Sequence, residues 1–292
     1  IDERLNMDPK KNPAYKHCEA RFFLAYKDNK VVGRIGGIIN YKYNEKMNVS
    51  QVRFTRFDVI DDIEVSKALF DTIVAWGKER GMHEIVGPIG FSDLDKQGML
   101  VEGFEEMNLF ITLYNHPYYL EHMQQLGFAK DVDWVEYQIP VPDSMNERFE
   151  KLSQAIQKRY GYRLLEFTSK KQVLKYIYDA FGVVNEAFDH LYGVVALTPE
   201  QIDFYVKQYI ALINLDFVYI VVNKEDEVIG FGLLGPSLSD AAKKSKGHLF
   251  PFGWIRILRG VKKYDVLDMY TIAVKPEYQN KGINALILHE GI

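Results

Sequence analysis

The sequence predicts an α/β (α+β) protein with two similar domains, each a mixed, mainly antiparallel sheet flanked by helices. Its 292 residues exceed the ~100–200 residues that one domain usually holds. Residues 22–40 and 216–237 share a pattern of strand, turn and strand, with Gly33 and Gly230 at matching positions. In both halves, strands then alternate with amphipathic helices, which is typical of an α/β arrangement. We therefore expect a duplicated domain rather than one large fold.

The composition limits the partners and the location that we expect. The net charge is −4, from 36 Lys and Arg against 40 Asp and Glu, so no nucleic-acid partner is expected. Cys18 is the single cysteine and cannot form an internal disulfide, which fits a reducing cytoplasm. No apolar run reaches 18 residues, and the first residues lack an apolar signal segment. We expect neither a membrane span, a membrane partner nor a signal peptide.

The first predicted domain covers residues 1–142. Its hairpin is expected to turn at Asp28-Asn29, because strand-forming apolar residues flank this pair. Asp62 is expected to cap a helix at 64–81, in which apolar side chains recur at helical spacing. The other predicted elements are strands at 51–60, 83–91 and 132–141 and a helix at 117–128.

The second predicted domain covers residues 162–292, after a linking helix at 143–161. The linking segment has apolar residues at helical spacing. Thr198 is a predicted helix cap. The other predicted elements are strands at 162–168 and 265–274, helices at about 171–188 and 199–213, and the hairpin at 216–237.

An aromatic segment, "HLFPFGW" at 248–254, lies between the second hairpin and the last strand. It could form an apolar wall over a substrate cleft or pack in the core, and core packing is favoured. The nearby "KKSK" at 243–246 is expected to be a solvated helix face or loop.

The stretch "VKPEYQNKGIN" at 274–284 joins the last strand to an apolar run. A helix that starts here offers unpaired backbone N–H groups and a partial positive charge. A diphosphate can bind at such a helix start if the backbone comes close. Gly282 has no Cβ to block that approach, and Lys281 adds a cation. The stretch therefore predicts an anion site.

The same stretch resembles the signature of the GNAT acyl-CoA transferase superfamily, V-x-P-x-[YF] followed by [RQ]-x-x-G-x-[GA]. Asn284 departs from the last position of the signature. The matching residues are Val274, Pro276, Tyr278, Gln279 and Gly282. The resemblance implies that acetyl-CoA or another acyl-CoA binds here as co-substrate, with the strand end supplying backbone groups to the pantetheine arm. The implied cofactor-binding residues are Ile272, Ala273, Val274, Gln279, Asn280, Lys281, Gly282, Ile283 and Asn284.

The first domain lacks this device. Its corresponding loop contains Asp61, Asp62 and Glu64 and no glycine. Carboxylates so placed repel a diphosphate, although they suit a helix start. We therefore expect a degenerate GNAT-like domain that does not bind the cofactor. Met123 stands where the superfamily often has a thiolate-facing tyrosine, and Tyr118 and Tyr119 are expected to pack nearby or to line a cleft.

Asp268 and Tyr270 are the candidate catalytic residues. By resemblance, Asp268 takes the position of the glutamate base in the histone-acetyltransferase branch of the superfamily, and the alternative is a structural hydrogen bond. Tyr270 lies two residues further along, on the same face of the strand. The general acid is expected beyond Ile292, so the second domain is predicted to be incomplete at its C-terminus.

The predicted function is N-acetyltransferase activity of the GNAT type, with a small-molecule or peptide amine as acceptor. Residues 87–128 also resemble a family of tandem GNAT-like bacterial proteins. Two alternatives stay open: an aminoacyl or peptidyl transferase of the Fem type, and a CoA-binding or interaction module without turnover. The seven histidines show no metal-ligand spacing, so no metal site is expected. The chain could form a homo-oligomer.

Overall fold

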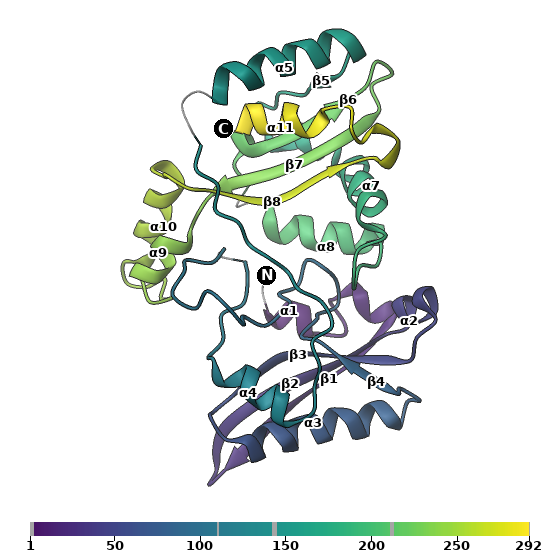
Figure 1. Cartoon of the computed structure of the whole chain (residues 1–292), viewed down its shortest axis with the longest axis vertical. Helices are drawn as coiled ribbons and strands as arrows, with labels where there is room; N and C mark the ends of the chain where they lie inside the picture. The colour runs from purple at the N-terminus through teal and green to yellow at the C-terminus, as the bar shows by residue number, and fades with distance from the viewer. Residues whose placement is uncertain (1–2, 110, 142–144, 211–212, 292) are drawn as a thin grey trace. The chain divides into compact units, whose positions relative to one another are not determined.

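The structure, a computed structural model, describes residues 3–109, 111–141, 145–210 and 213–291. These residues form two four-stranded sheets with helices against them (Figure 1). One sheet is mixed, and the other is antiparallel throughout its described strands. The predicted fold class is thereby confirmed.

The chain divides into two compact units, each described separately below. The N-terminal unit contains Asp8–Glu136 and Tyr192–Val195. The C-terminal unit contains Ile1–Met7, Tyr137–Leu191 and Ala196–Ile292. The predicted boundary between residues 142 and 143 lies outside the described residues, and the predicted domain limits stay predictions.

The N-terminal sheet is built on the first predicted hairpin. Asp28 and Asn29 have φ angles of 50° and 59°, the left-handed values that a two-residue hairpin turn needs at both central positions. The strands are β1 (Cys18–Lys27), β2 (Lys30–Asn40), β3 (Gln51–Val59) and β4 (Glu84–Val86). Only β4 runs parallel to its neighbour, β3, which it follows after the crossover helix.

Helix α3 (Ile63–Lys78) covers one face of this sheet and buries Leu69, Ile73 and Trp76. It begins at the predicted cap, since the Asp62 side chain accepts a hydrogen bond from the Glu64 N–H. The unit also contains η1 (Pro13–Lys16), α2 (Tyr41–Met47) and α4 (Tyr118–Gln125).

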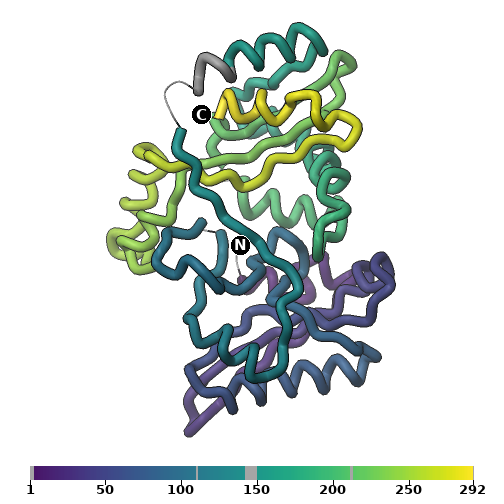
Figure 2. Tube along the Cα trace, viewed as in Figure 1, coloured from purple at the N-terminus to yellow at the C-terminus, as the bar shows by residue number. Residues whose placement is uncertain are grey.

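The C-terminal sheet lies between two helical layers. One face carries α5 (Met145–Tyr160) and α11 (Ile283–Gly291), which run side by side, and the other carries α7 (Ile177–Phe188) (Figures 1 and 2). Its strands are β5 (Arg163–Leu164), β6 (Val218–Val222), β7 (Val228–Pro236) and β8 (Leu267–Val274). Further elements of the unit are α1 (Glu3–Met7), α6 (Lys170–Val173), α8 (Pro199–Tyr209), η2 (Leu215–Phe217), α9 (Ser239–Lys244), α10 (Gly253–Lys262) and η3 (Pro276–Tyr278).

The two sheets repeat the same register around the matching glycines. Gly33 lies opposite Val59 of β3, and Gly230 lies opposite Val274 of β8. Each hairpin has a bulge in its second strand, where Val32 and Ile229 are the extra residues, immediately before this glycine. The strand that pairs with the second strand of the hairpin, β3 in one sheet and β8 in the other, has a further bulge. The duplication predicted from the two hairpins is therefore present in the strand pairing itself.

The glycines also let a helix approach the sheet. A Cβ on Gly33 would lie 2.9 Å from the Leu69 side chain of α3, and a Cβ on Gly230 would lie 2.6 Å from the Ile283 side chain of α11. In each unit a helix thus packs directly on the glycine in the second strand of the hairpin.

Some predicted elements were wrong. Residues 132–141 form no strand, although their apolar residues alternate. The helix predicted at 171–188 is two helices, α6 and α7, and the strand predicted at 83–91 is only the three residues of β4. None of the described helices is both long and apolar enough to cross a membrane.

We expect Asn29→Gly to stabilise the first hairpin and Asn29→Val to destabilise it. Glycine accepts a positive φ without strain, whereas a left-handed conformation costs other residues about 1–2 kcal/mol. Urea unfolding should rank glycine above wild type and valine below, and hydrogen exchange at β1 amides should follow the same order. Equal stability of the two variants would contradict the assigned turn.

Candidate functional site

The connection between β8 and α11 has the backbone shape of an anion-binding nest. Asn280 and Gly282 have φ angles of 60° and 84°, both left-handed. Alternation of such residues with ordinary ones turns successive N–H groups toward a common point, which is a known way to bind anions.

The N–H groups of residues 280–284 have no hydrogen-bond acceptor among the described residues. The first helical bonds of α11 run from the N–H groups of Ala285 and Leu286 to the Gly282 carbonyl. No described side chain caps this helix start. Five consecutive donors and the positive end of the helix dipole are therefore available to a ligand.

The matching place in the N-terminal unit is filled by the protein itself. The Asp62 carboxylate caps α3 and pairs with Lys27 at 2.9 Å. Beside it, the His122 ring hydrogen-bonds Ser66 Oγ at 2.8 Å and Asp61 at 3.2 Å. The side chains at this helix start thus supply the acceptors that a bound anion would supply at α11.

The ends of β3 and β8 also differ in whether their outward backbone groups are hydrogen-bonded. Lys275 N–H bonds to the Ile229 carbonyl, so the antiparallel pattern directs the backbone groups of Val274 and Ile272 away from β7. The groups of Ala273 face β7 instead, and its side chain is buried. Because β8 is the last strand of the described sheet, the groups of Ile272 and Val274 lie along an open edge.

Val59 is the residue that matches Val274 in register, and its outward groups are occupied. Its N–H donates to the Tyr119 hydroxyl at 3.1 Å, and its carbonyl accepts from the Tyr118 hydroxyl at 2.7 Å. Burial, followed by the hydrogen bond to Asp58, raises the pKa of Tyr119, so the phenol stays protonated at neutral pH. These two tyrosines close the strand edge of the N-terminal unit.

The structure gives Gly282 a packing role in addition to the one predicted from the sequence. A Cβ on Gly282 would lie 2.3 Å from Cδ1 of Ile156 in α5. The left-handed φ disfavours a side chain as well. Glycine is therefore needed here for packing and backbone conformation, whether or not a ligand approaches the N–H side.

The other loop side chains make local contacts. Gln279 Nε2 donates to the Val274 carbonyl at 3.2 Å, which occupies one of the outward strand groups. Lys281 Nζ lies 4.7 Å from the centre of the Tyr278 ring, and the Tyr278 hydroxyl accepts from Asn223. The Ile283 side chain is buried, so Ile283 offers a ligand only its backbone.

Asp268 and Tyr270 lie together on β8, next to its bulge. Asp268 is 3% exposed and faces Gly235 across the sheet. Burial, followed by the neighbouring charge and hydrogen bond of Asp268, raises the pKa of Tyr270 to about 12. The phenol is therefore protonated at neutral pH and donates to the carboxylate. The pair lies near the start of β8, whereas the loop follows the end of this strand.

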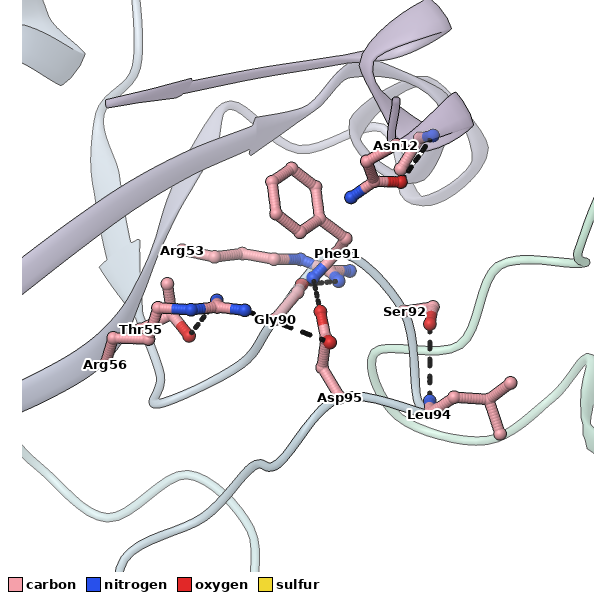
Figure 3. Close-up of polar contacts among 10 residues, drawn as sticks. Asn12, Arg53, Thr55, Arg56, Gly90, Phe91, Ser92, Leu94 and Asp95 are labelled. Carbon is pink, nitrogen blue, oxygen red and sulfur yellow. Dashed lines mark hydrogen bonds and ion pairs between the residues drawn. The ribbon is translucent and has the colours of Figure 1, made fainter. Parts of the chain in front are cut away.

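The N-terminal sheet has a buried cation at the position that matches Asp268. Arg53 faces Ile38, five residues after Gly33, just as Asp268 faces Gly235, five residues after Gly230. Arg53 is 1% exposed. Its guanidinium donates to the Gly90 carbonyl at 3.3 Å (Figure 3). It also donates to the Gly193 carbonyl, at 3.0 Å.

Acidic residues beside Arg53 shape the loop that follows β4. The Asp95 carboxylate accepts from the Phe91 N–H at 2.6 Å and lies 4.0 Å from the Arg56 guanidinium (Figure 3). Burial raises the pKa of the Asp93 carboxyl group. This polar cluster was missed in the sequence analysis, although a charged residue inside the apolar strand 51–59 was the available signal.

Two other chemistries find no support in the described residues. No group of three or more His, Cys, Asp or Glu side chains there could hold a metal ion. Burial raises the pKa of the Cys18 thiol to about 12, which suppresses the thiolate that a cysteine nucleophile requires.

We expect Gly282→Ala to destabilise the C-terminal unit more than Gly247→Ala does. Gly247 also has a left-handed φ, 74°, but a Cβ there would meet nothing within 4 Å, so it should cost only about 1–2 kcal/mol. Adding Ile156→Ala should cancel part of the Gly282→Ala effect, with a coupling of about 0.5–3 kcal/mol. Urea unfolding of the four variants measures these differences, and strictly additive losses would contradict the contact.

Comparison with known proteins finds relatives along nearly the whole chain. No family model matches. The chain is 28% identical to Protein YghO of Escherichia coli K12 over 284 residues, which is 95% of this chain and 71% of that protein. It is 24% identical over 280 residues to a bacterial ceramide synthase of Caulobacter vibrioides, covering 94% of this chain and 71% of the relative. A solved tandem GNAT protein from the clavulanic acid biosynthesis pathway, determined without AcCoA, matches with a TM-score of 0.43 and 11% identity, over 95% of this chain and 69% of its own. Both sequence relatives thus align across both units.

Proposed function

We propose that this chain is an acyltransferase that moves an acyl group from an acyl-CoA thioester to an amine. The observation that carries the proposal is the contrast at matching positions. The N-terminal unit fills its helix start and strand edge with Asp62, Tyr118 and Tyr119. In the C-terminal unit the corresponding N–H groups have no acceptor among the described residues, and only the Val274 carbonyl is bonded, to Gln279.

The residues around the end of β8 fit the polar parts of CoA. The N–H groups of residues 280–284 suit a diphosphate, and Lys281 adds positive charge beside them. The outward backbone groups of Ile272 and the N–H of Val274 suit the amides of the pantetheine arm, in the manner of a strand added to an edge. Ala273 and Gln279 support the site by holding the strand and the loop in place.

The bound co-substrate supplies a thioester carbonyl that an amine can attack. Asp268 would accept the proton that the amine loses as the amide bond forms and the C–S bond breaks. Tyr270 holds the Asp268 carboxylate through its hydrogen bond. CoA leaves as the thiolate of the broken C–S bond.

The proposal leaves two candidates for the acceptor and for the length of the acyl chain. The simplest case is acetyl transfer to a small-molecule or peptide amine. The Caulobacter relative is named a ceramide synthase, and a ceramide is chemically the N-acyl derivative of a long-chain amino alcohol. That name favours a second candidate: transfer of a longer acyl chain to a lipid amine.

Two other functions use the same scaffold differently. A Fem-type transferase would take aminoacyl-tRNA, but the chain carries a net charge of −4 and so lacks the excess of cations that usually binds nucleic acid. A CoA-binding module would use the open loop without turnover.

Binding of CoA tests the loop directly. We expect Lys281→Glu to weaken CoA binding about tenfold or more, because a carboxylate beside the diphosphate replaces attraction by repulsion. Isothermal titration with CoA and acetyl-CoA measures the affinity. Lys207→Glu, an exposed charge reversal on α8 of the same unit, is the matched control and should bind as wild type does. Gly282 variants are unsuitable here because they perturb the fold.

Measurements of turnover test whether Asp268 acts as the base. We expect Asp268→Asn to lower kcat about 100-fold or more, the range typical of a lost general base, with unchanged CoA affinity. Release of free CoA thiol should be followed with acetyl-CoA and long-chain acyl-CoA against small amines, peptides and long-chain amino alcohols.

The outcomes separate the alternatives. If wild type binds no CoA, the proposal fails. Binding of CoA without turnover on any acceptor favours the module, and binding of aminoacyl-tRNA alone favours the Fem-type function. Full activity of Asp268→Asn would leave acyl transfer standing but remove Asp268 as its base.

A further inference from the structure

The segment from α9 to the end of α10 exposes an unusual number of large apolar side chains. Phe250 is 80% exposed and Phe252 is 67% exposed. Leu249, Trp254 and Leu258 are exposed as well. The expectation that residues 248–254 pack in the core was therefore wrong. Residues 239–263 are called the aromatic-basic segment below.

The same segment is strongly basic in an acidic protein. It contains seven Lys and Arg residues against one Asp, while the whole chain has a net charge of −4. Arg256 and Arg259, three residues apart, share one side of α10. Trp254, Leu258 and Lys262, at four-residue spacing, share another. Apolar and cationic side chains thus occupy adjoining parts of one surface.

The loop holds its aromatic residues outward through local bonds. Trp254 Nε1 donates to the Pro251 carbonyl at 3.0 Å, and the Trp254 N–H donates to the Leu249 carbonyl at 2.9 Å. A Cβ on Gly253 would lie 1.8 Å from the His248 carbonyl oxygen, so only glycine allows this tight turn. The exposed rings therefore belong to a loop that is held by its own hydrogen bonds.

We propose that the aromatic-basic segment binds the surface of a bilayer that contains anionic phospholipid. Aromatic and leucine side chains enter the boundary between headgroups and acyl chains, and adjoining Lys and Arg attract anionic headgroups. The charge of the segment is complementary to such a surface. Water solvates exposed aromatic rings poorly. Insertion into the bilayer interface removes their apolar surface from water, which is favourable.

Surface binding differs from the membrane partner that the sequence analysis excluded. That expectation was based on the lack of a long apolar run, which a helix needs to span a bilayer but not to lie on it. Binding of this kind does not depend on the acyl transfer proposed above, and it can be measured without CoA.

Vesicle flotation with the 292-residue chain tests the proposal. We expect the protein to float with phosphatidylcholine vesicles that contain phosphatidylglycerol, and to float less without the anionic lipid or at high salt. Phe250→Ser with Phe252→Ser should reduce the vesicle partition coefficient tenfold or more, because each buried ring contributes more than a factor of about ten. Arg259→Glu with Lys262→Glu should remove the preference for phosphatidylglycerol.

Matched controls keep the test specific. Tyr26→Ser removes an aromatic ring that is 64% exposed on the first hairpin, and Lys30→Glu with Lys78→Glu reverses two exposed charges in the N-terminal unit. Both should float as wild type does. Circular dichroism checks that the variants are folded.

Three results would overturn the proposal. The first is a wild-type protein that does not float with anionic vesicles. The second is equal flotation of the double-phenylalanine variant and Tyr26→Ser. The third is self-association in sedimentation velocity that the phenylalanine variant abolishes while flotation is absent, which would make a second copy of the chain the occupant.

Discussion

Close packing of a helix on a strand glycine is the constraint on which both units depend. Leu69 lies over Gly33 and Ile283 over Gly230, in each case because a side chain on the glycine would collide with the helix. Since interiors are close-packed, such a contact fixes the helix against the sheet. The helix is thereby held against the strands of the hairpin. The loop that joins β3 to α3, or β8 to α11, must therefore run close to the end of that strand.

The two units use the same geometry in opposite ways. In one, Asp62 accepts from the helix start and two tyrosine hydroxyls bond to Val59. In the other, the matching donors have no acceptor among the described residues. Polar groups at an unfilled site are bonded to water, and a ligand that replaces the water with ionic acceptors gains charge-assisted hydrogen bonds. The filled site offers no such gain, because its own carboxylate and phenols would first have to be displaced.

The sequence predicted the features that depend on local chemistry. The Asp28-Asn29 turn and the Asp62 cap need only a few neighbouring residues, and both are present. Features that depend on a distant partner were wrong or missed. Residues 132–141 alternate as a strand does but pair with no other strand, and alternation alone cannot supply a partner. The contact of Ile156 with Gly282 joins residues more than a hundred positions apart, so the glycine looked like a ligand contact when it also serves packing. Residues 248–254 were predicted to pack in the core because they are aromatic, but composition alone does not show whether other elements cover a segment.

Charge placement within the sheets argues for a division of labour between the units. Asp268 in β8 and Arg53 in β3 occupy matching buried positions and carry opposite charges. A carboxylate can accept and release a proton. A guanidinium cannot, because it stays protonated at any physiological pH, and here its donors hold the carbonyls of Gly90 and Gly193. With a cation in place of the carboxylate, this position cannot exchange a proton and instead holds two loop carbonyls. At this position the N-terminal unit therefore has a residue that holds two loops together. Of the two units, only the C-terminal one has a residue here that could accept a proton.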